Sequence, residues 1–550
     1  MQFKNLQEKI HHGRSLSEPI PVLGIDIVRL LKRGIGNKDT FLIYRDSEGN
    51  RIEISYREFY EAVLNTARFF QSKGLKVGDK IGTISHNHWH TVIHYFAAWF
   101  CGLVAVPVNL SEDDQRIEYI LENAEVKLAL VREDYTSRIQ DIAIGNDKLS
   151  SVQLIECGHN LDPFSLEKGD LKEPDFDSET EALIVFTSGT TGNPKGVVLT
   201  QRNLLEDARS ISEWHTIESK TRMMCVLPIH HVNGTVVTVM TPFFVGGSVV
   251  LNEKFQIDQF FPIIEEEKID IVSVVPTLLQ YLNSFYEDKK APGLDYFSHV
   301  ICGAGPLTVN VAKNFEEKFG KRIIHGYGLS ETTCYSCYLP LDISDKAHQK
   351  WMQDFGYPSI GVAIPANEMA IHDENGNTLK EGERGEIVIR GVNVMKGYFN
   401  NREANENAFS NGWFRSGDEG FYQKDEEGNA YYFITGRIKE LIIRGGINFA
   451  PLEIDEVINK APGVKAGIAV GFENDWYGEE VGAYVELEEG VEENSDRIIE
   501  YCKEHLPHSK TPKVIVFGNE IPVTSTGKYQ RRKVAHLFSE WKEVQFRKNK

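Results

Sequence analysis

The chain has 550 residues, of which 41% are hydrophobic and 25% charged, so it is long enough for more than one globular domain. Its formal net charge of −20 argues against a nucleic-acid-binding protein, which needs a basic surface, and against general attraction to anionic lipid. The cysteines are scattered and odd in number, and residues 1–14 are too polar for a signal peptide, so we expect a cytoplasmic protein without a disulfide framework.

Strands and helices alternate through the first part of the chain. The apolar patterns predict strands at residues 41–45, 51–55, 80–84, 104–108 and 127–131, and helices at residues 56–73, 90–101 and 113–124. In the first of these helices Phe59, Val63 and Phe70 repeat with helical spacing, and Gly74 marks its end. This alternation is typical of a doubly wound, largely parallel α/β sheet, and we interpret it as a scaffold without chemistry.

One stretch resembles a membrane span, because Thr91 to Glu112 carries no formal charge until its last residue. It is interrupted by Gly102 and Pro107, however, and His94 lies near its start. We therefore interpret it as a buried helix followed by a strand and expect no transmembrane segment.

The run Thr-Ser-Gly-Thr-Thr-Gly-Asn-Pro-Lys-Gly at residues 187–196 has the composition of a loop that wraps a polyphosphate. Its glycines let backbone N–H groups approach phosphate, its hydroxyls add donors, and Lys195 adds a positive charge. Expected strands at residues 182–186 and 197–200 flank it, so it differs from the nucleotide loop that opens a helix. The alternative interpretation is a polar hairpin turn.

This run is similar to the signature loop of the acyl-adenylate-forming superfamily, which includes acid–CoA ligases, nonribosomal adenylation domains and beetle luciferases. The resemblance implies an α/β fold with a large N-terminal domain of doubly wound sheets plus a β-barrel-like subdomain, and a small mobile α+β C-terminal domain. The domains would be residues 1–436 and 440–550, with a hinge at 437–439. The implied cofactors are ATP, Mg²⁺ and CoA. The residues that the resemblance assigns to the nucleotide in this loop are Thr187 (also catalytic and a metal ligand), Ser188, Gly189, Thr190, Thr191 and Lys195.

Two further motifs support the resemblance. Residues 302–307, Cys-Gly-Ala-Gly-Pro-Leu, follow an expected strand at 298–301, and small residues there allow a ligand to lie against the backbone. Residues 325–333, His-Gly-Tyr-Gly-Leu-Ser-Glu-Thr-Thr, match the superfamily pattern Y-G-x-[ST]-E. The resemblance implies that Tyr327 stacks on adenine and that Glu331 is a catalytic ligand of Mg²⁺, a cation that prefers carboxylate and phosphate oxygens. The cofactor-binding residues implied in these motifs are Gly303, Ala304, Gly305, Gly326, Tyr327, Gly328, Ser330 and Thr332.

The histidine pair His230-His231 lies in an uncharged run and is, by itself, typical of a packed and hydrogen-bonded core. The resemblance instead implies that His231 is catalytic, lining the acid pocket and gating the thiol. Residues 226–251 contain no acidic side chain, which disfavours an α-amino acid substrate because a buried ammonium would lack a partner. We interpret the C-x-x-C pair at Cys334 as pocket or core packing rather than a metal site. The implied substrate pocket comprises His231, Val232, Asn233, Gly303, Ala304, Cys334 and Tyr335.

Residues 412–418, Gly-Trp-Phe-Arg-Ser-Gly-Asp, resemble the family's ribose-binding motif, in which Asp418 accepts from the 2′ and 3′ hydroxyls; a turn with a solvated aspartate is the alternative. By the same resemblance Arg437 contacts the ribose and Lys439 is the hinge, where many members carry aspartate. Lys439 is also expected to contact the cofactors.

The remainder of the chain predicts a small α+β domain, with helices at 452–460 and 494–505 and strands at 467–470 and 483–487. The resemblance implies that Gly445 and Gly446 wall the pantetheine tunnel after a domain rotation. It also implies that Lys528, in a Pro-Val-Thr-Ser-Thr-Gly-Lys run, is the catalytic lysine between the acid carboxylate and the α-phosphate; without it, a lysine after Thr-Gly is ordinarily a solvated turn residue.

Together these motifs predict an acid–CoA ligase that converts a fatty or aryl acid to acyl-AMP and then to acyl-CoA. One alternative is an adenylating enzyme that loads a carrier-protein phosphopantetheine, and another is a non-catalytic nucleotide-binding protein on the same fold. The expected partners are a small carboxylic acid, ATP and CoA, with an acyl carrier protein and a homodimer as possible further partners and no nucleic acid.

Overall fold

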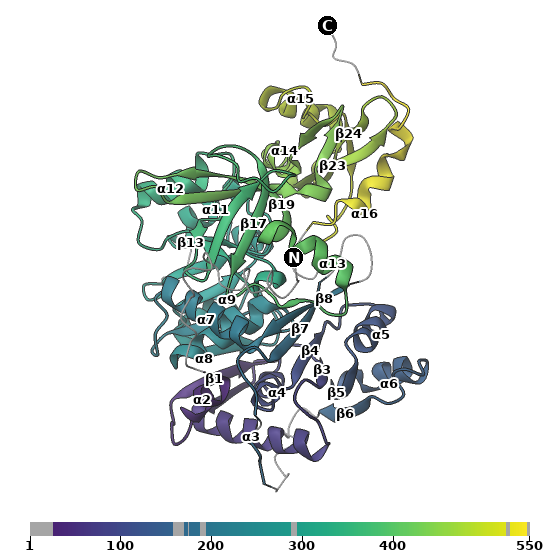
Figure 1. The fold of residues 1–550 in the computed structure, drawn as a ribbon. Helices are drawn as coiled ribbons and strands as arrows, with labels where there is room; N and C mark the ends of the chain where they lie inside the picture. The colour runs from purple at the N-terminus through teal and green to yellow at the C-terminus, as the bar shows by residue number, and fades with distance from the viewer. Residues whose placement is uncertain are drawn as a thin grey trace.

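Four β-sheets organise the part of the chain that the computed structural model describes, residues 26–157, 170–173, 175–187, 194–287, 294–523 and 529–546. Two large sheets and a four-stranded sheet build the N-terminal part, and the fourth sheet belongs to a small C-terminal domain (Figure 1). This is the expected α/β architecture, and the four-stranded antiparallel sheet stands where a β-barrel-like subdomain was expected.

The first large sheet has nine strands in the order β15-β14-β13-β12-β11-β9-β10-β1-β2 and is parallel from β13 to β1. Its strands are β1 (Thr40–Arg45), β2 (Arg51–Ser55), β9 (Arg222–Cys225), β10 (Ser248–Asn252), β11 (Ile271–Val274), β12 (His299–Cys302), β13 (Arg322–Tyr327), β14 (Cys337–Tyr338) and β15 (Val362–Ala363). The second has seven strands in the order β18-β8-β7-β4-β3-β5-β6. Its strands are β3 (Lys80–Ile84), β4 (Val104–Val108), β5 (Val126–Arg132), β6 (Gln153–Cys157), β7 (Glu181–Thr187), β8 (Lys195–Thr200) and β18 (Gly397–Tyr398).

The four-stranded sheet pairs β16 (Asn367–His372), β17 (Gly385–Gly391), β19 (Phe414–Lys424) and β20 (Ala430–Arg437). The sheet of the small domain contains β21 (Ile442–Arg444), β22 (Ile447–Phe449), β23 (Val464–Asn474), β24 (Gly478–Leu487) and β25 (Val514–Phe517). The helices of the N-terminal part are α2 (Ile27–Lys32), α3 (Tyr56–Ser72), α4 (Trp89–Phe100), α5 (Asp114–Asn123), α6 (Thr136–Ile144), α7 (Gln201–Trp214), α8 (Thr241–Val245), α9 (Phe260–Glu267), α10 (Pro276–Phe285), α11 (Val309–Phe319), α12 (Asp345–Gln353) and α13 (Arg402–Ala408). Those of the small domain are α14 (Pro451–Ile458), α15 (Ser495–His505) and α16 (Arg532–Ala535).

The predicted elements occur, with ends displaced by no more than two residues, except for two strands of the small domain. Strands β23 and β24 extend well beyond the predicted 467–470 and 483–487, because they form one long antiparallel hairpin. The hairpin end carries Glu473, Asn474 and Glu479, whose polarity hides the strand from an apolar pattern. The loop after β7 also ends earlier than predicted, since Lys195 already pairs with Thr187 across β7 and β8.

Helix α4 explains the uncharged stretch that resembles a membrane span. Its residues from His90 to Phe100 are buried, so that the helix is covered on every side. Trp99 Nε1 donates to the Ala182 carbonyl oxygen of β7 over 2.8 Å, which fixes the helix against the second sheet. No helix among the described residues is long and apolar enough to cross a membrane.

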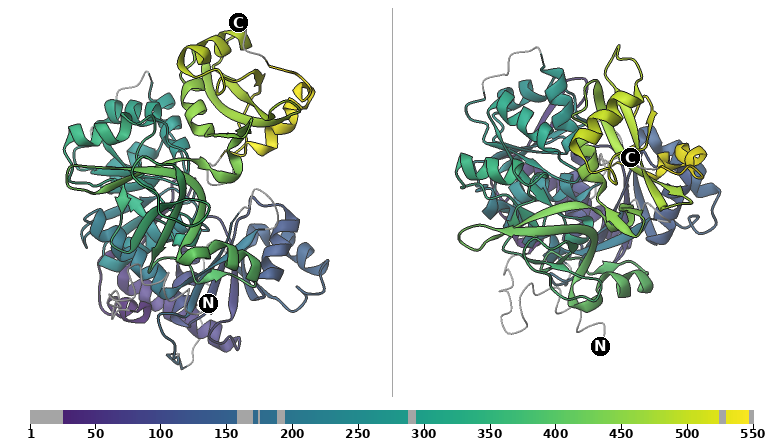
Figure 2. Two further views of the ribbon diagram at one scale, coloured as in Figure 1. Left: turned by 45° about the horizontal axis from the view of Figure 1, so that its top comes forward. Right: turned by 90° about the horizontal axis from the view of Figure 1, so that it is seen from above.

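The small domain lies at one end of the molecule and meets the rest mainly through α14 (Figure 2). Glu456 Oε1 accepts from the Val309 backbone N–H over 2.7 Å, at the first turn of α11. The Tyr357 hydroxyl lies 3.5 Å from the Glu453 carboxylate, and Gln280 Nε2 donates to the Lys465 carbonyl oxygen over 3.3 Å. Glu453 and Glu456, one helical turn apart on α14, together with the Gln280–Lys465 bond, therefore stabilise the domain orientation that the structure shows.

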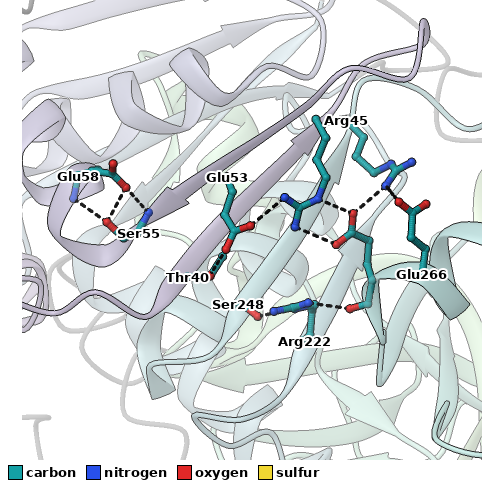
Figure 3. A network of polar contacts seen from close by, with 10 residues as sticks. Thr40, Arg45, Glu53, Ser55, Glu58, Arg222, Ser248 and Glu266 are labelled. Carbon is teal, nitrogen blue, oxygen red and sulfur yellow. Dashed lines mark hydrogen bonds and ion pairs between the residues drawn. The ribbon is translucent and has the colours of Figure 1, made fainter.

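A buried carboxylate fastens the β1–β2 hairpin to the edge of the first sheet. Glu267, at the end of α9, is 4% exposed and accepts from Arg45 Nη1 over 2.7 Å and from Arg51 Nε over 2.9 Å. Arg222 donates from below to the Glu267 carbonyl oxygen and to Ser248 (Figure 3). Burial opposes ionisation of Glu267, yet hydrogen bonds from Arg51 and Arg45 hold its pKa below the ordinary value.

We expect Glu267→Gln to lower the free energy of unfolding by about 1–3 kcal/mol, because two arginines lose their anionic partner. Since the pKa of Glu267 is lowered by folding, this contribution exists above its ordinary value of 4.5 and disappears as the pH falls below it. The difference between wild type and variant, measured by urea unfolding at several pH values, should shrink in acid. Glu53→Gln, which removes a more exposed partner of Arg51, is the control and should cost under about 1 kcal/mol. Equal losses in the two variants would contradict this account.

Candidate active site

Thr187, the last residue of β7, and Lys195, the first residue of β8, face each other. They are cross-strand partners, and the Thr187 hydroxyl lies 3.4 Å from the Lys195 carbonyl oxygen. Lys195 is exposed, and its Nζ lies 4.9 Å from the ring centroid of Tyr398 on β18, the strand paired with β8. Residues Ser188, Gly189, Thr190 and Thr191 lie outside the described residues. The described strands nevertheless place the lysine and the hydroxyl at one edge of the second sheet.

Glu331 lies on the other side of the same tyrosine. It belongs to a 3₁₀ turn, Ser330–Thr332, that follows β13 of the first sheet. The Tyr398 hydroxyl donates to Glu331 Oε1 over 2.8 Å, and the Met395 N–H donates to the Glu331 carbonyl oxygen over 2.8 Å. Burial and the neighbouring Glu331 charge raise the pKa of Tyr398, so it remains a neutral donor. One phenol thus joins the lysine of the second sheet to the carboxylate of the first.

A second group of polar residues joins the first sheet to the four-stranded sheet. Asp418 on β19 is 1% exposed and pairs in register with Arg437 on β20, whose Nε lies 3.0 Å from Asp418 Oδ1. The Tyr327 hydroxyl, at the end of β13, donates to Asp418 Oδ2 over 2.6 Å. Asp418 therefore sits between a phenol and a guanidinium, as an oriented acceptor.

The charge of Arg437 interacts with residues of both groups. The Asp418 charge is the main cause of its raised pKa, and Tyr327 and Glu331 add to it. In turn, the Arg437 charge favours ionisation of Tyr398. Segments from three sheets, far apart in the sequence, therefore present two cations, two carboxylates and two phenols to one region.

A strained turn follows Glu331. Thr333 has φ 63° and ψ −62°, and the Cys334 N–H donates to the Thr332 carbonyl oxygen over 2.7 Å, which is a γ-turn that β-branched residues rarely adopt. The Thr333 hydroxyl donates to the Asn393 carbonyl oxygen over 2.6 Å. Such a conformation persists only where its surroundings hold it.

Asn393 provides that support. Its side-chain amide donates to Asp207 Oδ1 on α7 over 2.8 Å and to the Tyr335 carbonyl oxygen over 2.9 Å, and its own oxygen accepts from Asn367. Burial raises the pKa of Asp207 to about 8, so the acid is neutral at pH 7. The segment after Glu331 is thus fixed by a buried polar network rather than by regular structure.

The glycines of the two strand-end motifs are required by close packing. The parallel strands β12 and β13 end side by side, with Cys302 paired to His325. A Cβ on Gly328 would lie 1.9 Å from the Cys334 carbonyl oxygen, and one on Gly303 would lie 2.5 Å from the Tyr335 hydroxyl. Ala304, next to Gly303, has φ 64°, a left-handed conformation that is uncommon for alanine.

The residues assigned to the acid pocket come from two places. His231 and Val232 precede a π-helix, Asn233–Met240, a rare geometry that is often found at functional sites. The rings of His230 and His231 are 4.4 Å apart, and burial lowers the pKa of His230, so it is neutral. Asn233 Nδ2 donates to the Tyr335 hydroxyl over 3.3 Å, which joins the π-helix to the segment after Glu331.

At the hinge and in the small domain, the described candidates form hydrogen bonds within that domain. Gly445 and Gly446 form the exposed turn of the β21–β22 hairpin, with φ of 60° and 79°, and the Gly445 N–H donates to the Tyr477 carbonyl oxygen in the small domain. Lys439 is exposed, and its carbonyl oxygen accepts from Arg532. Lys528 lies outside the described residues, although its flanks, Val523 and Tyr529, are bridged.

The sequence did not point to Tyr398 or Asn393. Both belong to residues 391–399, which cross from β17 to β18 and contact β8, Glu331 and Asp207 in turn. No periodicity or charge marks that segment, and only its pairing with β8 gives it a place in the site. The Gly397-Tyr398 pair is the one local signal, since glycine often marks a close backbone approach within a strand.

The donor set suits a nucleotide triphosphate with Mg²⁺. The half-exposed Glu331 carboxylate and the Thr187 hydroxyl are the hard oxygen ligands that Mg²⁺ prefers, and Lys195 and Arg437 supply positive charge for phosphate. Asp418, an oriented acceptor, suits a pair of sugar hydroxyls. No group of three or more His, Cys, Asp or Glu side chains that could hold a metal ion occurs among the described residues, so a Mg²⁺ ion here would depend on phosphate oxygens and water for its remaining ligands.

We expect Tyr398→Phe to raise the Mg²⁺ concentration needed for tight ATP binding by about 10–100-fold, because it removes the hydroxyl that orients Glu331 while keeping the ring under Lys195. Titration calorimetry of ATP at a series of Mg²⁺ concentrations measures this shift. Tyr296→Phe removes a comparable hydroxyl bond, to the Ile264 carbonyl oxygen, and is the control. An unchanged Mg²⁺ dependence in Tyr398→Phe would show that the bond does not serve a metal site.

Comparison with known proteins places the chain among nucleotide-dependent enzymes. The sequence profile described as AMP-binding enzyme matches residues 36–399, and that described as AMP-binding enzyme C-terminal domain matches residues 453–528. The chain is 31% identical to a sulfoacetate–CoA ligase of Cupriavidus necator, over 85% of this chain and 89% of the relative. It is 30% identical to an oxalate–CoA ligase of Arabidopsis thaliana, over 90% and 95%. The crystal structure of ATP-bound MatB from Rhodopseudomonas palustris has the same fold, with a TM-score of 0.83 at 24% identity, covering 94% of this chain and 100% of that one.

Proposed function

This chain belongs to the AMP-binding enzyme family and is an acid–CoA ligase that uses ATP, Mg²⁺ and CoA, and we propose that its site joins a carboxylic acid to AMP and then to the thiol of free CoA. The observation that carries the proposal is the set of contacts from Lys195 through Tyr398 to Glu331, together with the Arg437–Asp418 ion pair, whose arginine feels the Glu331 charge. These interactions connect the residues that the separate motifs assigned to phosphate, to the metal ion and to ribose.

In the first step, a carboxylate oxygen attacks the α-phosphorus of ATP, and the bond from that phosphorus to the bridging oxygen breaks. Acyl-AMP forms and pyrophosphate leaves with the electron pair. Lys195 and the loop 187–193 hold the departing phosphates, and Asp418 with Arg437 holds the ribose. Glu331 and Thr187 would hold Mg²⁺, which would offset the negative charge of the phosphates. To Lys528 we assign the role of offsetting the repulsion between the acid carboxylate and the α-phosphate.

In the second step, the CoA sulfur attacks the acyl carbon, the bond from that carbon to the phosphate oxygen breaks, AMP leaves with the electron pair, and the thiol proton is released to solvent. A domain rotation between the steps would bring the exposed Gly445–Gly446 turn to the narrow thiol arm, and the open space where their side chains would stand leaves room for that arm. The rotation is placed at residues 437–439, where Lys439 is exposed and the chain passes from β20 to β21. It withdraws Lys528 and brings this turn to the acyl-AMP, with His231 beside the acyl group.

The acid is proposed to carry no ammonium, because residues 226–251 contain no carboxylate to hold one. The uncharged residues Val232, Gly303 and Ala304 favour an apolar body, as in a fatty or aryl acid. Relatives of the chain are named for acids as different as oxalate and, in a 28% identical CoA ligase of Bacillus subtilis, long-chain fatty acids. The choice of acid must therefore come from the side chains of this site.

Acid-dependent exchange of ³²P-pyrophosphate into ATP tests the first step, and mass spectrometry of the product formed with CoA alone tests the second. We expect exchange with at least one acid and an acyl-CoA product. No exchange with any acid would favour a nucleotide-binding protein without catalysis. Acyl-AMP that accumulates with CoA present, and disappears only when a carrier-protein phosphopantetheine is added, would favour the carrier-loading alternative.

We expect Lys528→Ala to lower pyrophosphate exchange about 10²–10³-fold, by analogy with the loss of other groups that stabilise transition-state charge. Transfer from supplied acyl-AMP to CoA should be retained, because Lys528 is withdrawn in that step. Lys533→Ala, an exposed lysine nearby on α16, is the control and should leave both rates unchanged. Equal loss of both half-reactions in Lys528→Ala would argue against the rotation.

A further inference from the structure

Helix α7 follows the strand that carries Lys195 without an intervening loop. Strand β8 runs from Lys195 to Thr200, and Thr200 is the N-cap of α7. The helix is buried along most of its length, yet several of its buried side chains are polar. Two of them, Asn203 and Asp207, are 1% and 0% exposed and lie one turn apart on the same face of the helix. The proposed function gives neither residue a role.

The side-chain amide of Asn203 forms hydrogen bonds in two directions. Its oxygen accepts from the Thr200 N–H over 2.8 Å and from the Thr200 hydroxyl over 3.1 Å, at the junction of β8 and α7. Its nitrogen donates to the carbonyl oxygens of Val392 over 2.8 Å and of Val394 over 3.0 Å. A primary amide has two N–H donors, so both are used on the segment that leads to β18. The end of β8 is thereby tied to a segment far away in the sequence.

Asp207 holds the residue between these two carbonyl groups. Asn393 is 0% exposed, and its side-chain amide donates to Asp207 Oδ1 over 2.8 Å. Burial raises the pKa of Asp207 to about 8, so the acid makes this contact mostly in its neutral form at pH 7. Two polar side chains on one face of α7 therefore hold three consecutive residues, Val392 to Val394.

The same segment transmits this restraint to Glu331. The Met395 N–H donates to the Glu331 carbonyl oxygen over 2.8 Å, and the Asn393 carbonyl oxygen accepts from the Thr333 hydroxyl over 2.6 Å. Three residues after Met395, the Tyr398 hydroxyl donates to the Glu331 carboxylate. The turn that contains Glu331 follows β13 of the first sheet, whereas α7 continues from β8 of the second. Helix α7 is therefore connected to Glu331 by a continuous series of hydrogen bonds.

We propose that Asn203 and Asp207 are positioning residues for Glu331. Both are closed off from solvent, so each acts through residues 392–395, which fix Glu331 relative to Lys195. The inference rests on the proposed function, since it concerns the Mg²⁺ and phosphate groups of the same site. One helix then sets the spacing between the cation assigned to phosphate and the carboxylate assigned to the metal. Buried hydrogen bonds suit this task, because a shift of the segment would leave buried polar groups unpaired.

Calorimetric titration of ATP at a series of Mg²⁺ concentrations tests Asn203→Ala. We expect the Mg²⁺ concentration needed for tight ATP binding to rise about tenfold or more, since groups that orient a metal ligand typically contribute 10–100-fold to metal affinity. Binding of AMP without Mg²⁺ should be unchanged, because the Asp418–Arg437 pair assigned to ribose lies outside this series of hydrogen bonds.

Two outcomes of this titration would count against different claims. Loss of ATP and AMP affinity together, with an unaltered Mg²⁺ dependence, would show a purely structural role and overturn the proposal. Wild-type ATP binding that does not depend on Mg²⁺ would instead count against the metal site of the proposed function itself.

Thr200→Val is the matched control. It removes the hydroxyl that caps α7 and contacts the Asn203 oxygen, but it leaves the Asn203 nitrogen on the two carbonyl oxygens of the segment. We expect a lower midpoint of thermal unfolding and the wild-type Mg²⁺ dependence. A Mg²⁺ dependence shifted as far as in Asn203→Ala would assign the effect to the helix cap and overturn the proposal.

A pair of Asp207 variants keeps the proposal testable if Asn203→Ala does not fold. Asp207→Asn keeps an oxygen that can accept from Asn393, and little charge is lost because the acid is mostly neutral at pH 7. Asp207→Ala removes that acceptor, and we expect it to raise the Mg²⁺ concentration needed for ATP binding about tenfold. Asp207→Asn should bind ATP with the wild-type Mg²⁺ dependence. Equal Mg²⁺ requirements in the two variants would overturn the proposal.

Discussion

The hydrogen bond from Tyr398 to Glu331 is the contact on which the arrangement of the site depends. Strand β18 has two residues, yet it adds an antiparallel edge to the second sheet and carries its tyrosine under Lys195. The hydroxyl of that tyrosine ends on a carboxylate that belongs to the first sheet. The same short strand therefore sets the geometry between the lysine and the carboxylate, while the two large sheets also share one hydrophobic core.

The same segment carries Asn393 a few residues earlier, so one irregular stretch serves both sides of Glu331. On one side it orients the carboxylate, and on the other it holds the strained turn at Thr333 and the carbonyl oxygen of Tyr335. Because burial raises the pKa of Asp207 to about 8, the network holds this turn with a mostly uncharged acid at pH 7. The Glu331 carboxylate and the Tyr335 backbone are thus positioned by the same stretch.

The scaffold was predictable from the sequence because its strands are buried on both faces and its helices have one apolar side. The β3 and β4 strands and helix α3 follow those patterns closely. The motifs containing Lys195, Glu331 and Asp418 could be singled out because they combine glycine with polar residues after apolar strands. Their meeting could not be derived from spacing, since it depends on β18 and on the register of β19 with β20. The packing of the Tyr335 hydroxyl against Gly303 was equally hard to predict, because in the sequence Tyr335 is marked only as an uncharged residue.

The contact between Glu456 and the first turn of α11 has a mechanical consequence. Any large swing of the small domain must take that carboxylate away from a backbone N–H that it covers, at 7% exposure, and return both groups to water. This hydrogen bond therefore stabilises the domain orientation described. A ligand can shift the small domain only by as much as it binds the other orientation more tightly, so the strength of the Glu456–Val309 bond would contribute to how readily the domain changes orientation.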